Sequence, residues 1–217
     1  MMVLLLTLSE KAKRLEDIAN KIRKCTKCEL WKNRKNAVPG EGSPDAEIMF
    51  IGEAPGYHED LQGRPFVGAA GKFLTQLIES IGLRREDVYI TNVVKCRPPN
   101  NRDPLPEEIS ICSRYLEEQI EIISPKIIVT LGRHSTLYIL RRKDPHISGI
   151  SQVRGRVFDV SLKTLKVKVI PTYHPAAALY NPRLKTIIER DFKFIKTVYT
   201  GEYEKIRRDK ITLEDFF

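Results

Sequence analysis

Four short apolar runs, separated by segments with helical spacing, constrain the fold of this chain more than any other feature. The apolar runs are 47–52, 87–94, 126–132 and 167–171, and the helical segments are 72–81, 106–123 and 134–142. Nearly continuous apolar strands that alternate with helices are typical of a parallel sheet covered on both faces. A chain of 217 residues suits one such domain.

The segments at the two ends extend this pattern. A helix is predicted over 9–24, with Ser9 as its N-cap, because apolar residues recur there at helical spacing. A hairpin is predicted between 158–160 and 167–169, and a last amphipathic helix over 182–199. We therefore predict one α/β domain over residues 1–200 and a flexible charged tail over 201–217.

Charge and hydropathy limit the classes of partner. The chain has 37 Lys+Arg against 28 Asp+Glu, a net charge of +9, which favours a polyanion such as nucleic acid; an ordinary solvated basic surface is the alternative. No apolar run approaches the roughly 18 residues of a membrane span, and the apolar stretch 2–6 is too short for a signal peptide. We expect a cytoplasmic protein with no membrane partner, and nothing in the sequence indicates more than a monomer.

The chain has four cysteines, and their spacing suggests a metal site. They are Cys25, Cys28, Cys96 and Cys112, with two residues between the first pair and 15 between the second. Structural disulfides are not expected in a cytosolic protein, whereas a C-x-x-C pair and two distant thiolates can surround zinc or an iron–sulfur cluster. The spacing does not choose between these two, and four ordinary buried thiols are the alternative.

Polar residues follow the predicted strands at the edge where parallel α/β sheets bind ligands. Asn92 lies within the apolar run 87–94, where its carboxamide costs stability unless it is bonded. Its donor and acceptor match the O4 and N3–H edge of uracil, although a local backbone partner is the alternative. Phe66, in the Gly/Pro-rich loop 63–68, suits either stacking on a planar ring or ordinary packing.

His174 begins a small-residue loop with an apolar tip. Pro175 and Pro182 bound this loop. Beside a nucleic acid, such a loop could separate two base pairs while the histidine contacts the base that leaves the stack. A histidine with a purely structural role is the alternative.

Four segments carry a resemblance to a known family. In chain order they are GEAPGYHEDLQGRPFVGAAG (52–71), TNVVKCRPPNNRDP (91–104), VTLGRHS (129–135) and YHPAAALYNP (173–182). Together with the cysteines, they resemble the family 4 uracil-DNA glycosylases, the thermostable, 4Fe–4S-containing bacterial and archaeal branch of the uracil glycosylase superfamily. The resemblance covers about residues 25–195. It implies a three-layer α/β/α sandwich on a central four-stranded parallel sheet, with a cysteine-ligated metal cluster.

The resemblance also implies roles for single residues. Cys25, Cys28, Cys96 and Cys112 would ligate a structural 4Fe–4S cluster. Glu53, Ala54, Gly56, Phe66, Asn92 and His174 would bind uracil, with Phe66 stacking on the base, Asn92 reading its polar edge and His174 bonding O2. Glu53, Asn92 and His174 would be the catalytic residues, and the loop with Ala178, Leu179 and Tyr180 would enter the minor groove of DNA.

The implied reaction is base flipping followed by hydrolysis of the N-glycosidic bond, which leaves an abasic site for base excision repair. No lysine lies in a motif for a Schiff base, which favours a monofunctional enzyme. The best-studied relatives carry an Asp where this chain has Ala54, so the role of Glu53 toward water stays open. The loop also departs from the family, with Ala178 and Tyr180 in place of Leu and Arg. A non-catalytic damaged-DNA-binding module and a superfamily glycosylase with shifted base specificity are the alternatives.

The C-terminal tail carries a second resemblance. Leu213, Phe216 and Phe217 resemble the peptide motif that binds the sliding clamp (PCNA), with Lys210 where Gln is usual. One 3₁₀ turn would place these apolar side chains on one face. A tail that folds back on its own core is the alternative. A clamp of this kind would imply an archaeal source.

Overall fold

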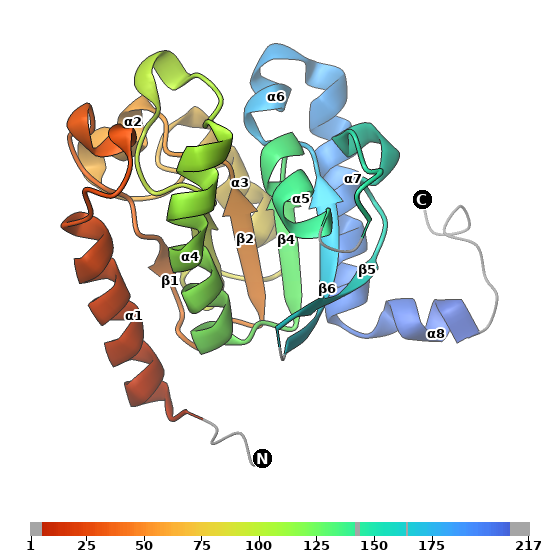
Figure 1. Ribbon diagram of the computed structural model, residues 1–217. Helices are drawn as coiled ribbons and strands as arrows, with labels where there is room; N and C mark the ends of the chain where they lie inside the picture. The colour runs from red at the N-terminus through yellow and green to blue at the C-terminus, as the bar shows by residue number, and fades with distance from the viewer. Residues whose placement is uncertain (1–5, 142–143, 164, 209–217) are drawn as a thin grey trace.

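The structure is a computed structural model that describes residues 6–141, 144–163 and 165–208 (Figure 1). The helices are α1 (Leu8–Arg23), α2 (Tyr57–Gln62), α3 (Ala69–Ser80), α4 (Pro106–Ile123), α5 (Arg133–Leu140), α6 (Ala176–Tyr180), α7 (Pro182–Tyr199) and α8 (Glu202–Arg208). The strands are β1 (Glu41–Gly42), β2 (Ile48–Gly52), β3 (Tyr89–Asn92), β4 (Ile127–Leu131), β5 (Phe158–Leu162) and β6 (Leu165–Thr172). All four predicted apolar runs are strands, and α4 and α7 have the predicted bounds.

The sheet is larger than predicted. Its six strands have the order β1-β3-β2-β4-β6-β5. The four central strands are parallel, whereas β1 pairs antiparallel with β3 and β5 pairs antiparallel with β6. The prediction of a four-stranded parallel sheet is therefore wrong in size: it describes the centre of a mixed sheet. The predicted hairpin is confirmed, with Val160 opposite Val167, and it adds β5 to the edge.

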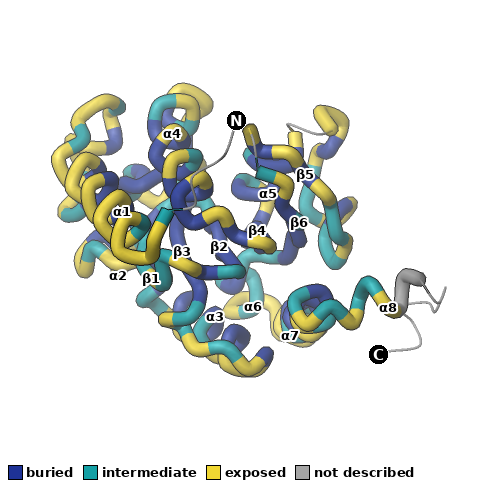
Figure 2. The backbone as a smooth tube through the Cα atoms, turned by 90° about the horizontal axis from the view of Figure 1, so that it is seen from below, coloured by how far each residue is buried: buried dark blue, intermediate teal, exposed yellow. Residues whose placement is uncertain are grey.

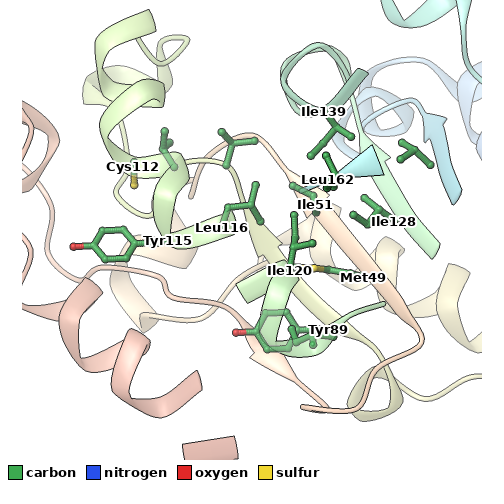
Figure 3. Close-up of a cluster of buried hydrophobic side chains, with 14 of the residues drawn as sticks. Met49, Ile51, Tyr89, Cys112, Tyr115, Leu116, Ile120, Ile128, Ile139 and Leu162 are labelled. Carbon is green, nitrogen blue, oxygen red and sulfur yellow. The ribbon is translucent and has the colours of Figure 1, made fainter. Parts of the chain in front are cut away.

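Two hydrophobic clusters make this a three-layer fold. Met49 and Ile51 of β2 belong to a cluster with residues of α1, α4 and α5, whereas Ile48 and Phe50 belong to a cluster with residues of α3 and α7. Figure 3 shows side chains of α4 packed over β2 in the first cluster. Figure 2 shows the buried central strands between the two helical layers. The apolar runs are continuous because both faces of the sheet are covered.

The first helix is capped by a different residue from the one predicted. The Thr7 hydroxyl accepts a hydrogen bond from the Glu10 amide at 3.3 Å, and the Glu10 carboxylate accepts one from the Thr7 amide at 2.7 Å. This capping box pairs an N-cap with a Glu three residues later. The prediction of Ser9 as the N-cap is therefore wrong, because Glu10 completes the box with Thr7.

The segment after residue 200 begins with a helix. Within α8, Tyr203 packs edge-on against Phe194 with 5.6 Å between the ring centroids. Glu204 also pairs with Lys168 at 2.8 Å. The division of the chain after residue 200 stays a prediction, and Leu213, Phe216 and Phe217 lie outside the described residues. Among the helices described, none combines the length and the apolar character that crossing a membrane requires.

Candidate active site

A cavity of about 350 Å³ opens at the carboxyl ends of the central strands. Because β2, β3, β4 and β6 are parallel, the segments that follow them meet at this edge. All six predicted uracil-binding residues line the cavity: Glu53, Ala54, Gly56, Phe66, Asn92 and His174. Its lining also includes Glu59, Pro98, Asn101 and Arg102, which the sequence did not single out.

Asn92 lines this cavity and has an unsatisfied polar atom. Asn92 is only 1% exposed. Among the described residues, its Oδ1 is the one buried side-chain polar atom without a hydrogen-bond partner. A buried polar atom left without a partner costs about 1–3 kcal/mol. The alternative of a local backbone partner for Oδ1 is not observed, and an N–H group of a ligand would satisfy this atom.

Gly52 lets Asn92 and Phe66 approach each other. A Cβ atom at Gly52 would lie 2.4 Å from Asn92 Oδ1 and 2.7 Å from Cζ of Phe66. Real Cβ atoms do not come this close to other heavy atoms. The last residue of β2 is therefore glycine because the amide and the ring occupy the space of a side chain.

Phe66 is held in an unusual backbone conformation. Its φ is 50°, which is uncommon for an aromatic residue and is typical of functional loops. Its buried ring stacks on the His174 ring with 5.5 Å between centroids and 27° between planes. Gly71 packs against the Phe66 backbone so closely that a Cβ would lie 1.9 Å from its carbonyl oxygen. Phe66 and His174 thus form one wall of the cavity.

Glu59 fixes the loops on both sides of Phe66. Its Oε1 accepts hydrogen bonds from the amides of Val67 at 2.8 Å and Gly68 at 3.0 Å. Its Oε2 accepts one from the Gly56 amide at 3.2 Å. Glu59 was not among the predicted site residues, although a Glu three residues after an N-cap glycine is a recognisable capping signal.

His174 is neutral and has a defined tautomer. Its apolar surroundings lower its pKa to about 4, because burial disfavours the charged ring. The Ala176 amide donates a hydrogen bond to Nδ1 at 3.2 Å. In a neutral imidazole the other nitrogen then carries the proton. His174 therefore offers an Nε2–H donor.

Glu53 lies next to a histidine–aspartate pair. His134 Nε2 is 3.1 Å from Asp103 Oδ2 and 3.8 Å from Glu53 Oε2. Burial raises the pKa of Glu53, and Asp103 raises it further, while His134 and Arg133 oppose the shift. A carboxylate with a raised pKa can accept a proton near neutral pH.

The four cysteines lie together in a second cavity, between α1, α4 and the segment after β3. Arg34 donates a hydrogen bond to Cys96 Sγ at 3.1 Å, and the Lys95 amide donates one to Cys112 Sγ at 3.2 Å. Burial raises the pKa of the Cys112 thiol to about 12. The thiolate form of Cys112 is therefore favoured only beside a positive charge, and a metal ion is one group that would provide it.

Comparison with known proteins decides the family. A model of the uracil DNA glycosylase superfamily matches residues 39–197. The chain belongs to this superfamily. The predicted resemblance is therefore confirmed.

Type-4 uracil-DNA glycosylases are similar over most of this chain. The protein of Saccharolobus solfataricus is 56% identical over 203 residues, 93% of this chain and 91% of the relative. The protein of Sulfurisphaera tokodaii is 62% identical over 196 residues, 87% of this chain and 89% of the relative. The protein of Thermotoga maritima is 47% identical over 191 residues, 87% of this chain and 96% of the relative.

In this glycosylase-superfamily chain, the predicted DNA-binding loop is a short helix, α6. Leu179 is 49% exposed and Tyr180 is 87% exposed. Ala178 instead packs against the cluster under α3 and α7. The expectation of a loop is wrong because the alanine run after Pro175 favours helix. Of the three predicted contacts, Leu179 and Tyr180 are the exposed ones.

Proposed function

We propose that this uracil-DNA glycosylase flips uracil out of DNA into the cavity at the sheet edge and hydrolyses its N-glycosidic bond, which leaves an abasic site. The activity is the one named for the relatives. The observation that carries the proposed roles is the unsatisfied Oδ1 of Asn92 in the same cavity as the neutral His174 ring.

Asn92 would select uracil by hydrogen-bond matching. Its Oδ1 accepts from N3–H of the base, and its Nδ2 donates to O4. Cytosine has no proton on N3 and carries an amino group in place of O4, so both contacts become mismatched. Each buried mismatch costs about 1–3 kcal/mol, which supports discrimination between the two bases.

His174 would stabilise the departing base. Negative charge develops on uracil as the bond between C1′ and N1 breaks, and Nε2–H donates to O2 without transferring its proton. A preorganised donor of this kind contributes about 3 kcal/mol in the transition state. The low pKa of His174 suits this role, since the ring stays a neutral donor at neutral pH.

Glu53 would accept the proton of the attacking water, whose oxygen bonds to C1′ as the electrons of the broken bond move to uracil. Two carboxylates line the cavity, Glu53 and Glu59. Glu59 already accepts three backbone hydrogen bonds. Glu53 is therefore the available base, in a chain that has Ala54 where better-studied relatives carry Asp.

A Glu53→Gln variant is expected to lower the single-turnover rate of uracil excision by about 10²–10⁴-fold, because the amide cannot accept a proton. Rapid-quench kinetics on a uracil oligonucleotide measure this rate. The affinity of the variant for DNA with an abasic site should equal that of wild type. Adding Ala54→Asp, which returns a carboxylate next to position 53, should recover part of the rate. A decrease below threefold would remove Glu53 from the chemical step.

A Gly52→Ala variant is expected to lower uracil excision by at least about tenfold, because a displaced catalytic contact has effects of this size or larger. The added methyl would move the Asn92 amide and the Phe66 ring. Gly149→Ala is the matched control, because a Cβ there meets only Ser151 Oγ at 3.9 Å. Equal rates for the two variants would contradict the packing of Asn92 and Phe66 around Gly52.

The four cysteines fit a 4Fe–4S cluster better than one zinc ion. A single zinc holds thiolates at about 2.3 Å, which places the sulfurs roughly 3.8 Å apart. Among the described residues, no three of these sulfurs come within 4.8 Å of one another, although all four share one cavity. When bound, the cluster would act as a structural cross-link between α1, α4 and the segment after β3.

Two further contacts with partners are proposed, one between α6 and DNA and one between the C-terminal tail and a sliding clamp. Leu179 and Tyr180, both exposed on α6, would enter the minor groove beside the flipped base. Leu213, Phe216 and Phe217 would bind a sliding clamp of the PCNA type, and that partner would place the chain in an archaeon. These contacts need one copy of the chain.

The activity is tested with an oligonucleotide that carries one uracil. Cleavage that requires both uracil and alkali treatment, opposite guanine and adenine alike, is expected. An intact strand after incubation with cluster-containing protein would favour a damaged-DNA-binding module. Faster release of hypoxanthine or mismatched thymine than of uracil would favour a shifted base specificity.

A further inference from the structure

A buried lysine, Lys95, bonds to the backbone of Asn92, and the proposed reaction does not use it. Lys95 is 1% exposed. Its Nζ donates hydrogen bonds to Thr91 Oγ1 at 2.6 Å, to the Asn92 carbonyl at 2.7 Å and to Gln119 Oε1 at 2.8 Å.

Lys95 Nζ is the donor in all three bonds, because each partner is oriented to accept. The Thr91 hydroxyl donates to the Pro39 carbonyl at 2.9 Å and therefore accepts from Lys95. The Gln119 amide nitrogen donates to Pro39 and to the Tyr89 hydroxyl, which fixes its oxygen toward Lys95. The Lys95 amino group therefore links β3, through Thr91 and Asn92, to α4, through Gln119.

A buried lysine is costly if its role is only to stabilise the fold. Its polar amino group leaves water on folding, and an apolar side chain of similar volume avoids that cost. The position of Lys95 suggests a different benefit. Its bond to Asn92 is made at the backbone of the residue that reads the base.

The backbone around Asn92 is fixed from two sides. The amides of Val93 and Val94 donate to the carbonyls of Gly52 and Glu53, both at 3.0 Å. The Asn92 carbonyl is fixed by its hydrogen bond from Lys95 Nζ. The first two bonds join this segment to β2, and the third joins it to α4 through Gln119.

We propose that Lys95 is a positioning residue for uracil excision: its Nζ donor fixes the backbone of Asn92, and thereby the direction of the carboxamide in the cavity. This inference rests on the proposed role of Asn92 in reading uracil. It assigns to Lys95 no contact with the base or with the reacting atoms.

A double-mutant cycle separates positioning from general stability. Lys95→Met, which keeps an unbranched chain but cannot donate, should lower the single-turnover rate of uracil excision by about 10- to 100-fold. In an Asn92→Ala background the same change should lower the rate less than about twofold. The same fold-decrease in both backgrounds would overturn the positioning role.

Two other variants of the same buried network provide a control and a substitute for Lys95→Met. Tyr89→Phe removes a hydroxyl from the same buried network and leaves the three Lys95 bonds in place, so its rate should match wild type. If Lys95→Met does not fold, Thr91→Val removes one acceptor and should show a smaller decrease, about threefold, with the same dependence on Asn92. An equal Thr91→Val effect in both Asn92 backgrounds would also overturn the proposal.

Two readouts distinguish the possible failures. An Asn92→Ala variant with wild-type activity would reject the proposed function of Asn92 rather than the role of Lys95 alone. Iron content and thermal unfolding of each variant show whether the cysteine site is intact. A Lys95→Met protein with full iron content, unchanged stability and unchanged rate would overturn the inference directly.

Discussion

Replacement of His174 by alanine is expected to lower the single-turnover rate of uracil excision by about 10²–10³-fold, because it removes the donor to the charge that develops on O2. The loss should appear in the chemical step, while binding of uracil-containing DNA changes little. Rapid-quench kinetics with saturating enzyme measure the first quantity, and fluorescence anisotropy with a non-cleavable uracil analogue measures the second.

The control for this variant is His146→Ala. His146 is exposed, its backbone amide bonds to Asp144, and neither residue lines the cavity, so its loss should leave the rate unchanged. A His174→Ala rate within threefold of the control would contradict the proposed donor.

The pH dependence of the rate tests the protonation state of His174. Its pKa of about 4 lies below its ordinary value because of burial, so the ring does not titrate between pH 6 and 8. We expect no step in the rate over this range that depends on His174. A step near pH 6.5 that disappears in His174→Gln would indicate a charged, proton-donating histidine instead.

Cys112→Ala is expected to have the largest effect on stability. Metal binding that requires the folded state adds to the free energy of folding, so losing one ligand should cost on the order of 5 kcal/mol or more. Thermal unfolding, iron and zinc content and the visible absorbance of the cluster together measure this loss. Ser113→Ala is the matched control, since Ser113 is the buried neighbour of Cys112 on α4.

Each outcome for the cysteine site has a clear meaning. Iron in wild type, its loss in Cys112→Ala and a large decrease in stability are expected. Stoichiometric zinc in wild type would contradict the cluster. Unfolding temperatures that agree between Cys112→Ala and Ser113→Ala would contradict any structural metal.

The centre of the fold could be predicted because its signals are local. A strand buried on both faces is continuously apolar, as in β2 and β4, and Pro106 and Pro182 mark the starts of α4 and α7. The strand β1 could not be predicted. It has two residues, Glu41 and Gly42, and forms only because the chain passes beside β3.

The candidate site also has residues that could be predicted from the sequence and residues that could not. Glu53, Asn92 and His174 follow predicted parallel strands, whose carboxyl ends share one edge. Glu59 makes only local contacts, with Gly56, Val67 and Gly68, so its capping position was a sequence signal that could have identified it. Lys95 could not be assigned, because its burial and its bond to Gln119 of α4 exist only in the folded chain. Lys95 in particular is one of 37 Lys+Arg residues in a basic chain, and only the fold distinguishes it from a surface lysine.

A crystal structure of the Glu53→Gln variant with a duplex that carries one uracil would test the central claim most directly. We predict an extrahelical uracil in the cavity, with the Asn92 amide within hydrogen-bond distance of N3 and O4 and His174 Nε2 within the same distance of O2. A uracil that stays stacked in the duplex, or one bound in the cavity without contacts to Asn92 and His174, would contradict this account.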